Sequence, residues 1–260
     1  MPDTIMTKPS FASLKGKVSP EEWQARVELA CCYRLMHHFG WSGTNFGTHL
    51  SARVPGETEH MLLNPVSIKF DQITASSLIK LHLDGKRITE SPYRVNGAGI
   101  AFHGGVYWHR PDAMGALHSH SESGVAISML KCGLQFTSLT SARFFNRIGY
   151  YDFKGPGDNK EERVHLAKAL GPHLALIMRN HGLLTVGRTI GEAMVVMVVL
   201  EQIIATQLRA MATGAELLYP SEEIMEKCAK DRDARSDRNN KRDWESLMEQ
   251  VDRIDPSYRD

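Results

Sequence analysis

Two histidines, His118 and His120, stand directly after an apolar run at residues 113–117. In an extended segment, side chains two residues apart project from one face, about 6.5–7 Å apart along the strand. Their ring nitrogens can therefore converge on one ion, at about 2.0–2.1 Å from each. The chain has 12 histidines, so this spacing alone is a modest signal and a third ligand has to come from elsewhere.

His181 is the best candidate for that third ligand. It stands in the segment 179–182, between two apolar runs that resemble buried strands, and Gly182 after it permits a close approach of backbone. A buried imidazole without a partner would be costly there. Three neutral imidazoles leave positions free for water or substrate, as in a catalytic site, and zinc, manganese, cobalt and ferrous iron are all compatible.

The pattern along the chain predicts a mixed α/β fold. Ser19 as N-cap, Pro20 at the first helical position and Glu22 completing a capping box predict a helix that ends at Gly40. Asp84-Gly85-Lys86 predicts a hairpin turn. Helices are also predicted at 99–109, 122–131, 161–170 and 189–212, and strands at 48–54, 60–63, 77–83, 113–118, 174–178 and 183–186. We expect a sandwich in which helices pack on a mainly antiparallel or mixed sheet.

Length and composition favour one large domain. With 260 residues, 42% of them hydrophobic, we expect a flexible arm at 1–18, one domain at 19–220 and a charged tail at 221–260. Within the tail, 227–242 is dense in both charge signs, which favours a solvated helix or a partly disordered segment over a binding function.

The charge balance and the apolar runs argue against several partners. Lys plus Arg number 31 against 30 for Asp plus Glu, so a net charge of +1 predicts neither nucleic acid nor an anionic membrane as partner. The longest apolar stretch, 193–204, is broken by Glu201 and Gln202 and is too short to span a bilayer. The four cysteines lack C-x-x-C spacing, and the N-terminus lacks a signal layout, so we expect reduced thiols in a cytoplasmic protein.

Several segments occur together in an order typical of one protein family: 26–30 with 33–35, 48–53, 73–78 with 83–85, His103 with 110–112, 118–120, 179–182 and 185–189. With these segments, the chain resembles the class II aldolase/adducin family over roughly residues 21–213. The resemblance implies a three-layer α/β/α sandwich around a mostly antiparallel sheet, and a homotetramer with sites at subunit boundaries. In the family's sugar-phosphate aldolases, the positions matching His118, His120 and His181 hold zinc for Lewis-acid cleavage of a carbon–carbon bond.

The sequence departs from those aldolases at three places. Their catalytic glutamate falls at Gly99, which cannot accept a proton. Their first phosphate loop, Gly-Asn-x-Ser, is replaced by Thr48-His49-Leu50-Ser51, and their second loop ends in Thr-Gly or Ser-Gly where this chain has Val66-Ser67. Small hydroxyls and backbone amides cradle phosphate, so this loss argues against a sugar phosphate. The pattern is similar to the branch that includes adducin heads, which tend to lack the metal histidines that this chain keeps.

Three residues are candidates for the missing acid or base. His49 aligns with the family's substrate loop, although a strand histidine bonded to backbone is the simpler interpretation. Glu122, two residues after His120, could be a further ligand or a base, although a carboxylate complementing a helix dipole is simpler. Tyr219 could match the C-terminal tyrosine that family aldolases take from a neighbouring subunit. His103 suits a supporting role, and Arg143 could pair with a carboxylate substrate.

These observations support three functional hypotheses. The first is a metal-dependent lyase, for aldol cleavage or decarboxylation, on a small hydroxy-carbonyl or hydroxy-acid compound, with zinc as the favoured metal. The second is a non-haem iron oxygenase acting on an aromatic 2-oxo acid, since an all-histidine set also suits ferrous iron. The third is a non-catalytic, adducin-like module that interacts with actin or the cytoskeleton. The retained ligand set favours the first, because a scaffold has no use for an open metal position.

Overall fold

A seven-stranded mixed sheet forms the centre of the computed structural model, which describes residues 11–43, 47–152 and 160–260. The strand order is β3-β2-β1-β4-β7-β6-β5, and β5 pairs with β6 in parallel while the other neighbours are antiparallel. The expected mostly antiparallel sheet is confirmed. The strands are β1 (His49–Val54), β2 (Glu57–Leu63), β3 (Ile79–His82), β4 (Gly115–Ser119), β5 (Ile148–Tyr151), β6 (Ala175–Met178) and β7 (Gly182–Gly187).

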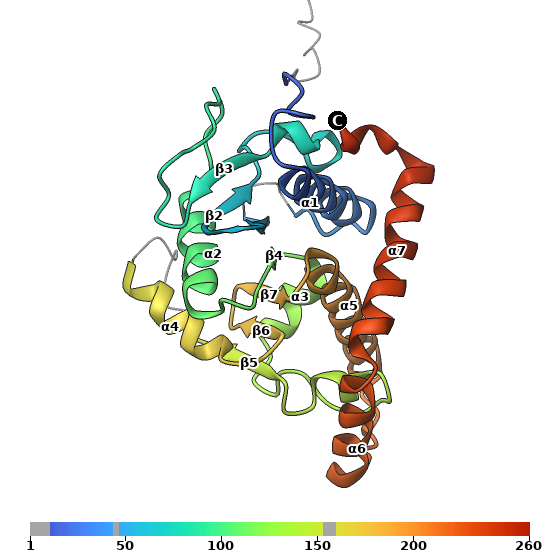
Figure 1. Cartoon of the computed structure of the whole chain (residues 1–260). Coiled ribbons are helices and arrows are strands. Elements are labelled where there is room, and N and C mark those ends of the chain that lie inside the picture. Colours follow the sequence, from blue (N-terminus) through green and yellow to red (C-terminus); the bar gives the residue numbers. More distant parts are fainter. Residues whose placement is uncertain (1–10, 44–46, 153–159) are drawn as a thin grey trace, which may run out of the picture.

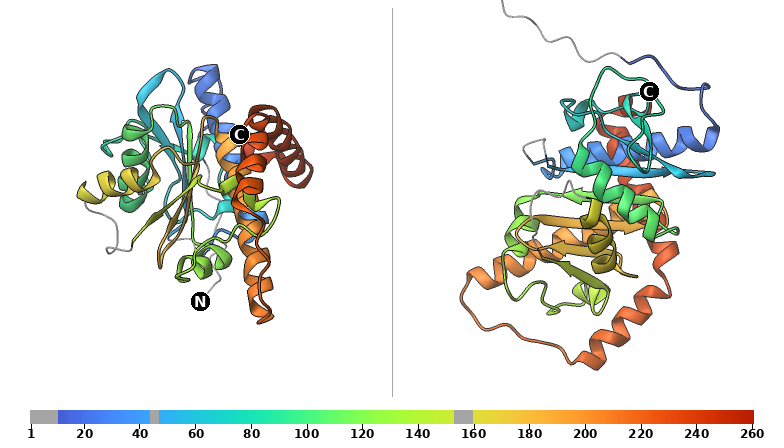
Figure 2. Two further views of the ribbon diagram at one scale, coloured as in Figure 1. Left: turned by 90° about the horizontal axis from the view of Figure 1, so that it is seen from below. Right: turned by 90° about the vertical axis from the view of Figure 1, so that its left-hand side faces the viewer.

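Helices cover both faces of this sheet, so the expected three-layer α/β/α sandwich is confirmed (Figures 1 and 2). On one face lie α2 (Gly97–His109) and α4 (Lys160–Leu170), over an apolar cluster that includes Phe102 and Leu166. On the other lie α1 (Pro20–His38), α3 (Glu122–Ser128) and α5 (Ile190–Ala212), over a larger cluster that includes Leu29 and Met194. The metal-ligand candidates lie in the sheet layer between these clusters.

The start of α1 shows how local signals and tertiary contacts compete. Ser19 caps the helix as expected, because its hydroxyl accepts a hydrogen bond from the Glu22 amide at 3.1 Å. The expected capping box is not completed. The Glu22 carboxylate instead accepts from the buried Arg26 at 2.8 Å and from Lys80 at 2.9 Å. A buried guanidinium requires a charged partner, and here that requirement outweighs the local cap.

Element boundaries differ from the sequence expectation in a few places. The helix α3 ends at Ser128, three residues before the expected end, and β5 was not predicted at all. The turn at 84–86 is confirmed, since Leu81 and Arg87 form an antiparallel bridge across it. The segment after the turn pairs with β3 through this single bridge and does not form a strand of its own. It lies at the edge of the sheet, beside the four-residue β3.

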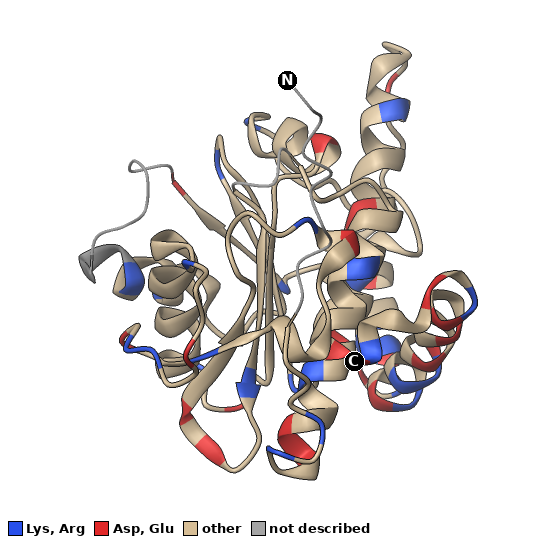
Figure 3. Cartoon of the chain, turned by 90° about the horizontal axis from the view of Figure 1, so that it is seen from above, with Lys and Arg blue, Asp and Glu red and all other residues tan. Residues whose placement is uncertain are grey.

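The C-terminal segment forms two helices, α6 (Glu222–Asp233) and α7 (Ser236–Ile254). The helix α7 packs along α5 and α1 and buries Trp244 and Val251 in the larger apolar cluster. Its charged residues lie on the remaining faces (Figure 3). The charge-dense segment 227–242 forms the end of α6 and the start of α7, as expected of a solvated helical segment.

The helix α5 is long and apolar enough, by composition, to cross a membrane. Half of its apolar window is buried inside the protein, where it packs on β4 and β7. A core helix of a three-layer sandwich meets this description without a membrane.

The contact between α7 and α5 depends on Gly191. A Cβ atom added there would lie 2.3 Å from Cγ of Trp244, so the indole occupies the space that any side chain would need. We predict that Gly191→Ala lowers the free energy of unfolding by about 1–3 kcal/mol, because an overpacked contact forces α7 outward. Urea unfolding measures this change.

Gly97→Ala is the matched control. Gly97 also opens a helix, and an added Cβ there meets nothing within 4 Å. This variant should stay within about 0.5 kcal/mol of the native protein. Equal effects of the two substitutions would show that α7 does not depend on the contact.

Candidate metal centre

Two adjacent strands bring the three candidate ligands together. His118 lies in β4 and His120 follows the end of that strand. His181 lies in the turn between β6 and β7, and β7 pairs directly with β4, with His118 opposite Leu184 and Ser119 opposite Leu183. The antiparallel pairing places the end of β4 beside the start of β7. His120 and His181, which are 61 positions apart in the sequence, therefore meet at the same end of these two strands.

The three rings surround one small space. Ring centroids are 4.6 Å apart for His118 and His120, 4.9 Å for His118 and His181, and 4.8 Å for His120 and His181. One nitrogen from each residue lies within 4.8 Å of the others, and Nε2 of His118 is 2.7 Å from Nε2 of His120. Three imidazole nitrogens at this separation fit a single first-row divalent cation.

The protonation state of the cluster also suits a cation. Nδ1 of His118 lies 2.8 Å from the carbonyl oxygen of Leu183, which only accepts, so Nδ1 carries the proton and Nε2 is left as a lone-pair donor. Burial lowers the pKa of His118 well below its usual value, lowers that of His120, and lowers that of His181 to about 4. Neighbouring imidazoles lower the pKa of His118 and His181 further. Neutral imidazoles at physiological pH are the form that binds a metal.

Two glycines allow the backbone to close around His120. A Cβ at Gly47 would lie 2.2 Å from Nδ1 of His120, and a Cβ at Gly182 would lie 2.3 Å from the carbonyl oxygen of Ser119. The close approach expected at Gly182 is confirmed. The Thr48 hydroxyl then fixes the loop, because it accepts a hydrogen bond from the His120 amide at 3.1 Å.

A second histidine pair lies beside the cluster. His49 is the cross-strand neighbour of His118, and their ring centroids are 4.9 Å apart. Nδ1 of His49 lies 2.7 Å from Nε2 of His103 on α2. Both rings are buried, and burial lowers the pKa of His49 well below its usual value and that of His103 to about 3. Nδ1 of His103 has no hydrogen-bond partner among the described residues.

The ring of His49 occupies the space next to Gly99. A Cβ at Gly99 would lie 3.2 Å from Cγ and 3.3 Å from Cδ2 of this ring, so a longer side chain at position 99 would displace it. Gly99 is the position at which the resemblance places the aldolase glutamate, and an imidazole from β1 lies against its backbone. The two departures seen in the sequence, His49 and Gly99, are therefore one structural feature.

Two residues of this region were missed by the sequence analysis. The carboxylate of Glu201, on α5, accepts hydrogen bonds from the hydroxyls of Ser121 and Ser123 and so ties the segment after His120 to the core. Burial raises the pKa of that carboxyl. The ring of Phe102 lies 5.8 Å from His118 and 5.9 Å from His181 and covers the cluster from α2. The one signal for Glu201 was its interruption of an apolar helix.

The other sequence candidates lie apart from the histidine cluster. Glu122 is exposed at the first position of α3 and does not belong to the group of potential ligand atoms. Tyr219 is 60% exposed on the segment after α5, where its hydroxyl donates to Gln135 at 3.1 Å. Arg143 lies in the 3-10 turn η3 (Ser141–Phe144) and donates to Asn240 on α7 at 3.0 Å. Catalytic roles for Glu122 and Tyr219 remain predictions.

Residues 27–208 match the family described as the class II aldolase and adducin N-terminal domain. The chain belongs to this family. It is 40% identical over 249 residues to a Caulobacter vibrioides protein that is named, provisionally, as a class 2 aldolase, with 95% of this chain and 96% of that protein covered. It is 39% identical to rat alpha-adducin over 171 residues, which are 65% of this chain and 23% of the adducin.

Solved structures in the same family share the fold. An aldolase II superfamily protein from Pseudomonas syringae superposes with a TM-score of 0.91 and 36% identity, over 96% of this chain and all of the other. An L-fuculose 1-phosphate aldolase from Glaciozyma antarctica superposes with a TM-score of 0.81 and 27% identity, over 98% and 97% of the two chains. The class II aldolase architecture therefore extends through the C-terminal helices.

The buried histidines predict a specific acid sensitivity. His103 has a pKa of about 3 when folded and about 6.5 when unfolded, so the unfolded chain takes up the proton first as pH falls. This contribution to stability is complete above about pH 6.5, and about 2 kcal/mol of it is lost between pH 7 and pH 5. We predict that His103→Gln flattens the pH dependence of the free energy of unfolding by about this amount.

His165→Gln is the control for this prediction, since His165 is exposed on α4. It should leave the pH profile unchanged. Urea unfolding of the metal-free protein at pH 7 and pH 5 measures both variants. An unchanged profile in His103→Gln would show that the buried ring does not titrate as described.

Proposed function

We propose that this chain is a metal-dependent lyase that breaks a carbon–carbon bond in a small hydroxy-carbonyl or hydroxy-acid compound. The observation that carries the proposal is the convergence of His118, His120 and His181 on one small space, with the Nδ1 proton of His118 held by Leu183 so that its Nε2 carries a lone pair. Membership of the class II aldolase and adducin family supports the reaction class. The three-histidine set fits a divalent cation such as zinc, which in such a site supplies Lewis-acid polarisation of substrate oxygens.

His49 takes the role of the general acid and base in this proposal. In a hydrogen bond between two neutral imidazoles, one ring donates and the other accepts, so the His49–His103 pair has two tautomeric arrangements. In one, Nε2 of His49 presents a lone pair that can remove a proton, and in the other it presents a proton that can be returned. Its place beside His118 brings this atom next to the cluster. Burial lowers the pKa of His49, so the resting ring is neutral. A proton taken up at its Nε2 gives the His49–His103 pair one positive charge, which is lost again when the proton is returned to the product.

The substrate proposed here carries no phosphate. The histidine at position 49 stands where the family's phosphate loop has an asparagine, and its ring is committed to His103 rather than to an anion. A neutral, buried imidazole offers little attraction to a dianion. Phe102 supplies an apolar wall, which suits a compound with a hydrophobic part. A homotetramer, with Tyr219 of one subunit reaching the site of the next, belongs to the same proposal.

The metal requirement is tested first. We predict that the purified protein binds about one zinc or other first-row divalent ion per chain, and that His118→Ala reduces the affinity by at least about 100-fold, since it removes one of three ligands. His60→Ala is the matched control, because His60 lies on β2 and hydrogen-bonds to Glu57 of the same strand, outside the histidine cluster. Elemental analysis and competition with a chelator provide the measurements. If neither the native protein nor His60→Ala binds metal in stoichiometric amounts, the proposal fails.

The role of His49 is tested separately. We predict that His49→Gln keeps the metal but lowers kcat by about 10²–10⁴-fold, the usual contribution of one general acid or base. The assay follows cleavage of short hydroxy-carbonyl and hydroxy-acid compounds, with L-fuculose 1-phosphate as the phosphorylated comparison. Normal turnover in His49→Gln would assign the acid–base role elsewhere, and preference for the phosphorylated sugar would contradict the proposed substrate class.

Two further assays of the purified protein distinguish the oxygenase and the adducin-like hypotheses from the lyase. Oxygen uptake with aromatic 2-oxo acids, after anaerobic loading with ferrous iron, would support an oxygenase. Co-sedimentation with actin, unaffected by His118→Ala, would support an adducin-like module. Either result without carbon–carbon cleavage would replace the lyase proposal.

A further inference from the structure

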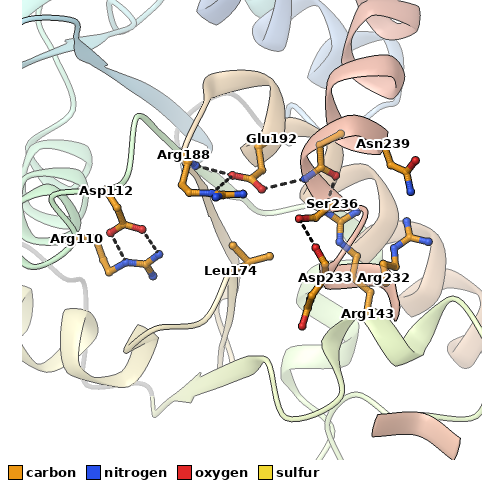
Figure 4. Close-up of a pocket in the computed structure, with 11 residues that line it drawn as sticks. Arg110, Asp112, Arg143, Leu174, Arg188, Glu192, Arg232, Asp233, Ser236 and Asn239 are labelled. Carbon is orange, nitrogen blue, oxygen red and sulfur yellow. Dashed lines mark hydrogen bonds and ion pairs between the residues drawn. The ribbon is translucent and has the colours of Figure 1, made fainter. Parts of the chain in front are cut away.

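A cavity lined by charged side chains lies at the opposite end of the sheet strands from the histidine cluster. It has a volume of about 230 Å³ and is lined by Arg110, Arg188, η3 and the junction of α6 and α7 (Figure 4). Arg110 precedes β4 and Arg188 follows β7, whereas His118, His120 and His181 stand at the other ends of these strands. Strands of five or six residues separate the two places by about 15 Å or more.

The carboxylates of this cavity are already engaged. Asp112 receives two hydrogen bonds from Arg110, both at 2.8 Å. Asp233 pairs with Arg147 at 2.8 Å. Glu192 lies 3.5 Å from Arg188 and accepts from Asn240 at 2.9 Å. Each acid around the cavity therefore has its own cationic partner.

Two arginines are left without a carboxylate. Arg143 is only 5% exposed, and its Nη2 donates to Asn240, while its Nη1 has no hydrogen-bond partner among the described residues. Arg232, at the end of α6, lines the same cavity, and its side chain forms no hydrogen bond or ion pair with any residue in the described ranges. A buried guanidinium with an unused donor is costly unless something accepts from it.

The two unpaired guanidinium groups act on each other. Burial, and then repulsion from Arg232, lower the pKa of Arg143 to about 10, while Glu192, Asp243 and Asp233 act in the opposite direction. Arg143 therefore stays charged at neutral pH. Two like charges that share one cavity are stabilised by an anion between them, and the planar guanidinium fork matches phosphate and carboxylate oxygens.

We propose that this cavity binds a small oxyanion, a phosphate or carboxylate group, between Arg143 and Arg232. The ligand would accept hydrogen bonds from the unpaired Nη1 of Arg143 and from Arg232. Because Arg143 belongs to the sheet domain and Arg232 to α6, the anion would also fasten the C-terminal helices to the sheet. This site is independent of the proposed lyase chemistry.

The test is calorimetric titration of the full-length, metal-free protein with inorganic phosphate and, separately, with malonate, at ionic strength held constant with chloride. We predict saturable binding of at least one of the two anions, which also raises Tm. The metal-free protein excludes anion binding at the histidine cluster. Phosphate alone would identify a phosphate or phosphomonoester as the ligand class, and malonate alone a carboxylate.

Three variants make the result decisive. Arg232→Gln should weaken binding by about tenfold or more, since it removes a charged donor. Arg238→Gln, which removes an exposed arginine from α7, should bind like the native protein. Arg143→Lys keeps the charge but loses the fork, and should also bind more weakly. The proposal is overturned if neither anion binds saturably, or if Arg232→Gln binds as tightly as the native chain.

Discussion

The antiparallel pairing of β4 with β7 is the constraint on which the rest of the molecule depends. It places Ser119 opposite Leu183 and thereby brings the end of one strand, with His118 and His120, against the turn that carries His181. The Leu183 carbonyl fixes the tautomer of His118 through the same pairing. A slip of one residue in this register would turn His118 toward the opposite face and separate the three rings. Packing of α5 on β4 and β7 holds the register in place.

Around the β4–β7 pairing, glycines shape the site as much as the residues with larger side chains do. Glycines at 47 and 182 let the chain pass against His120 and Ser119, where any Cβ would clash. Gly99 leaves room for the His49 ring, which lies against His118 and is held by His103. The loss of a carboxylate and the gain of an imidazole belong together, because the two groups would occupy the same space.

Most of the fold could be predicted from the sequence, because the patterns that indicate its helices, strands and turns depend on neighbouring residues. Alternating apolar runs, the Ser19 cap and the 84–86 turn each depend on neighbouring residues, and they located six of seven strands. Two of the candidate ligands, His118 and His120, were visible as a spaced pair, and the third, His181, was predicted from its place in a turn. The His49–His103 contact and the hydrogen bonds of Glu201 could not be predicted from the sequence, because each joins residues more than 50 positions apart. The capping box expected at Glu22 fails partly for the same reason, since its carboxylate accepts from Lys80, 58 positions away, as well as from the buried Arg26.

The two ends of the central strands differ in chemical character. At one end, burial lowers the pKa of five imidazoles, so that neutral nitrogens face one another without repulsion. At the other end, guanidinium groups cannot shed their protons, and burial leaves Arg143 charged beside Arg232. Neutral imidazole nitrogens can coordinate a cation, whereas two positive guanidinium groups in one cavity are stabilised by an anion.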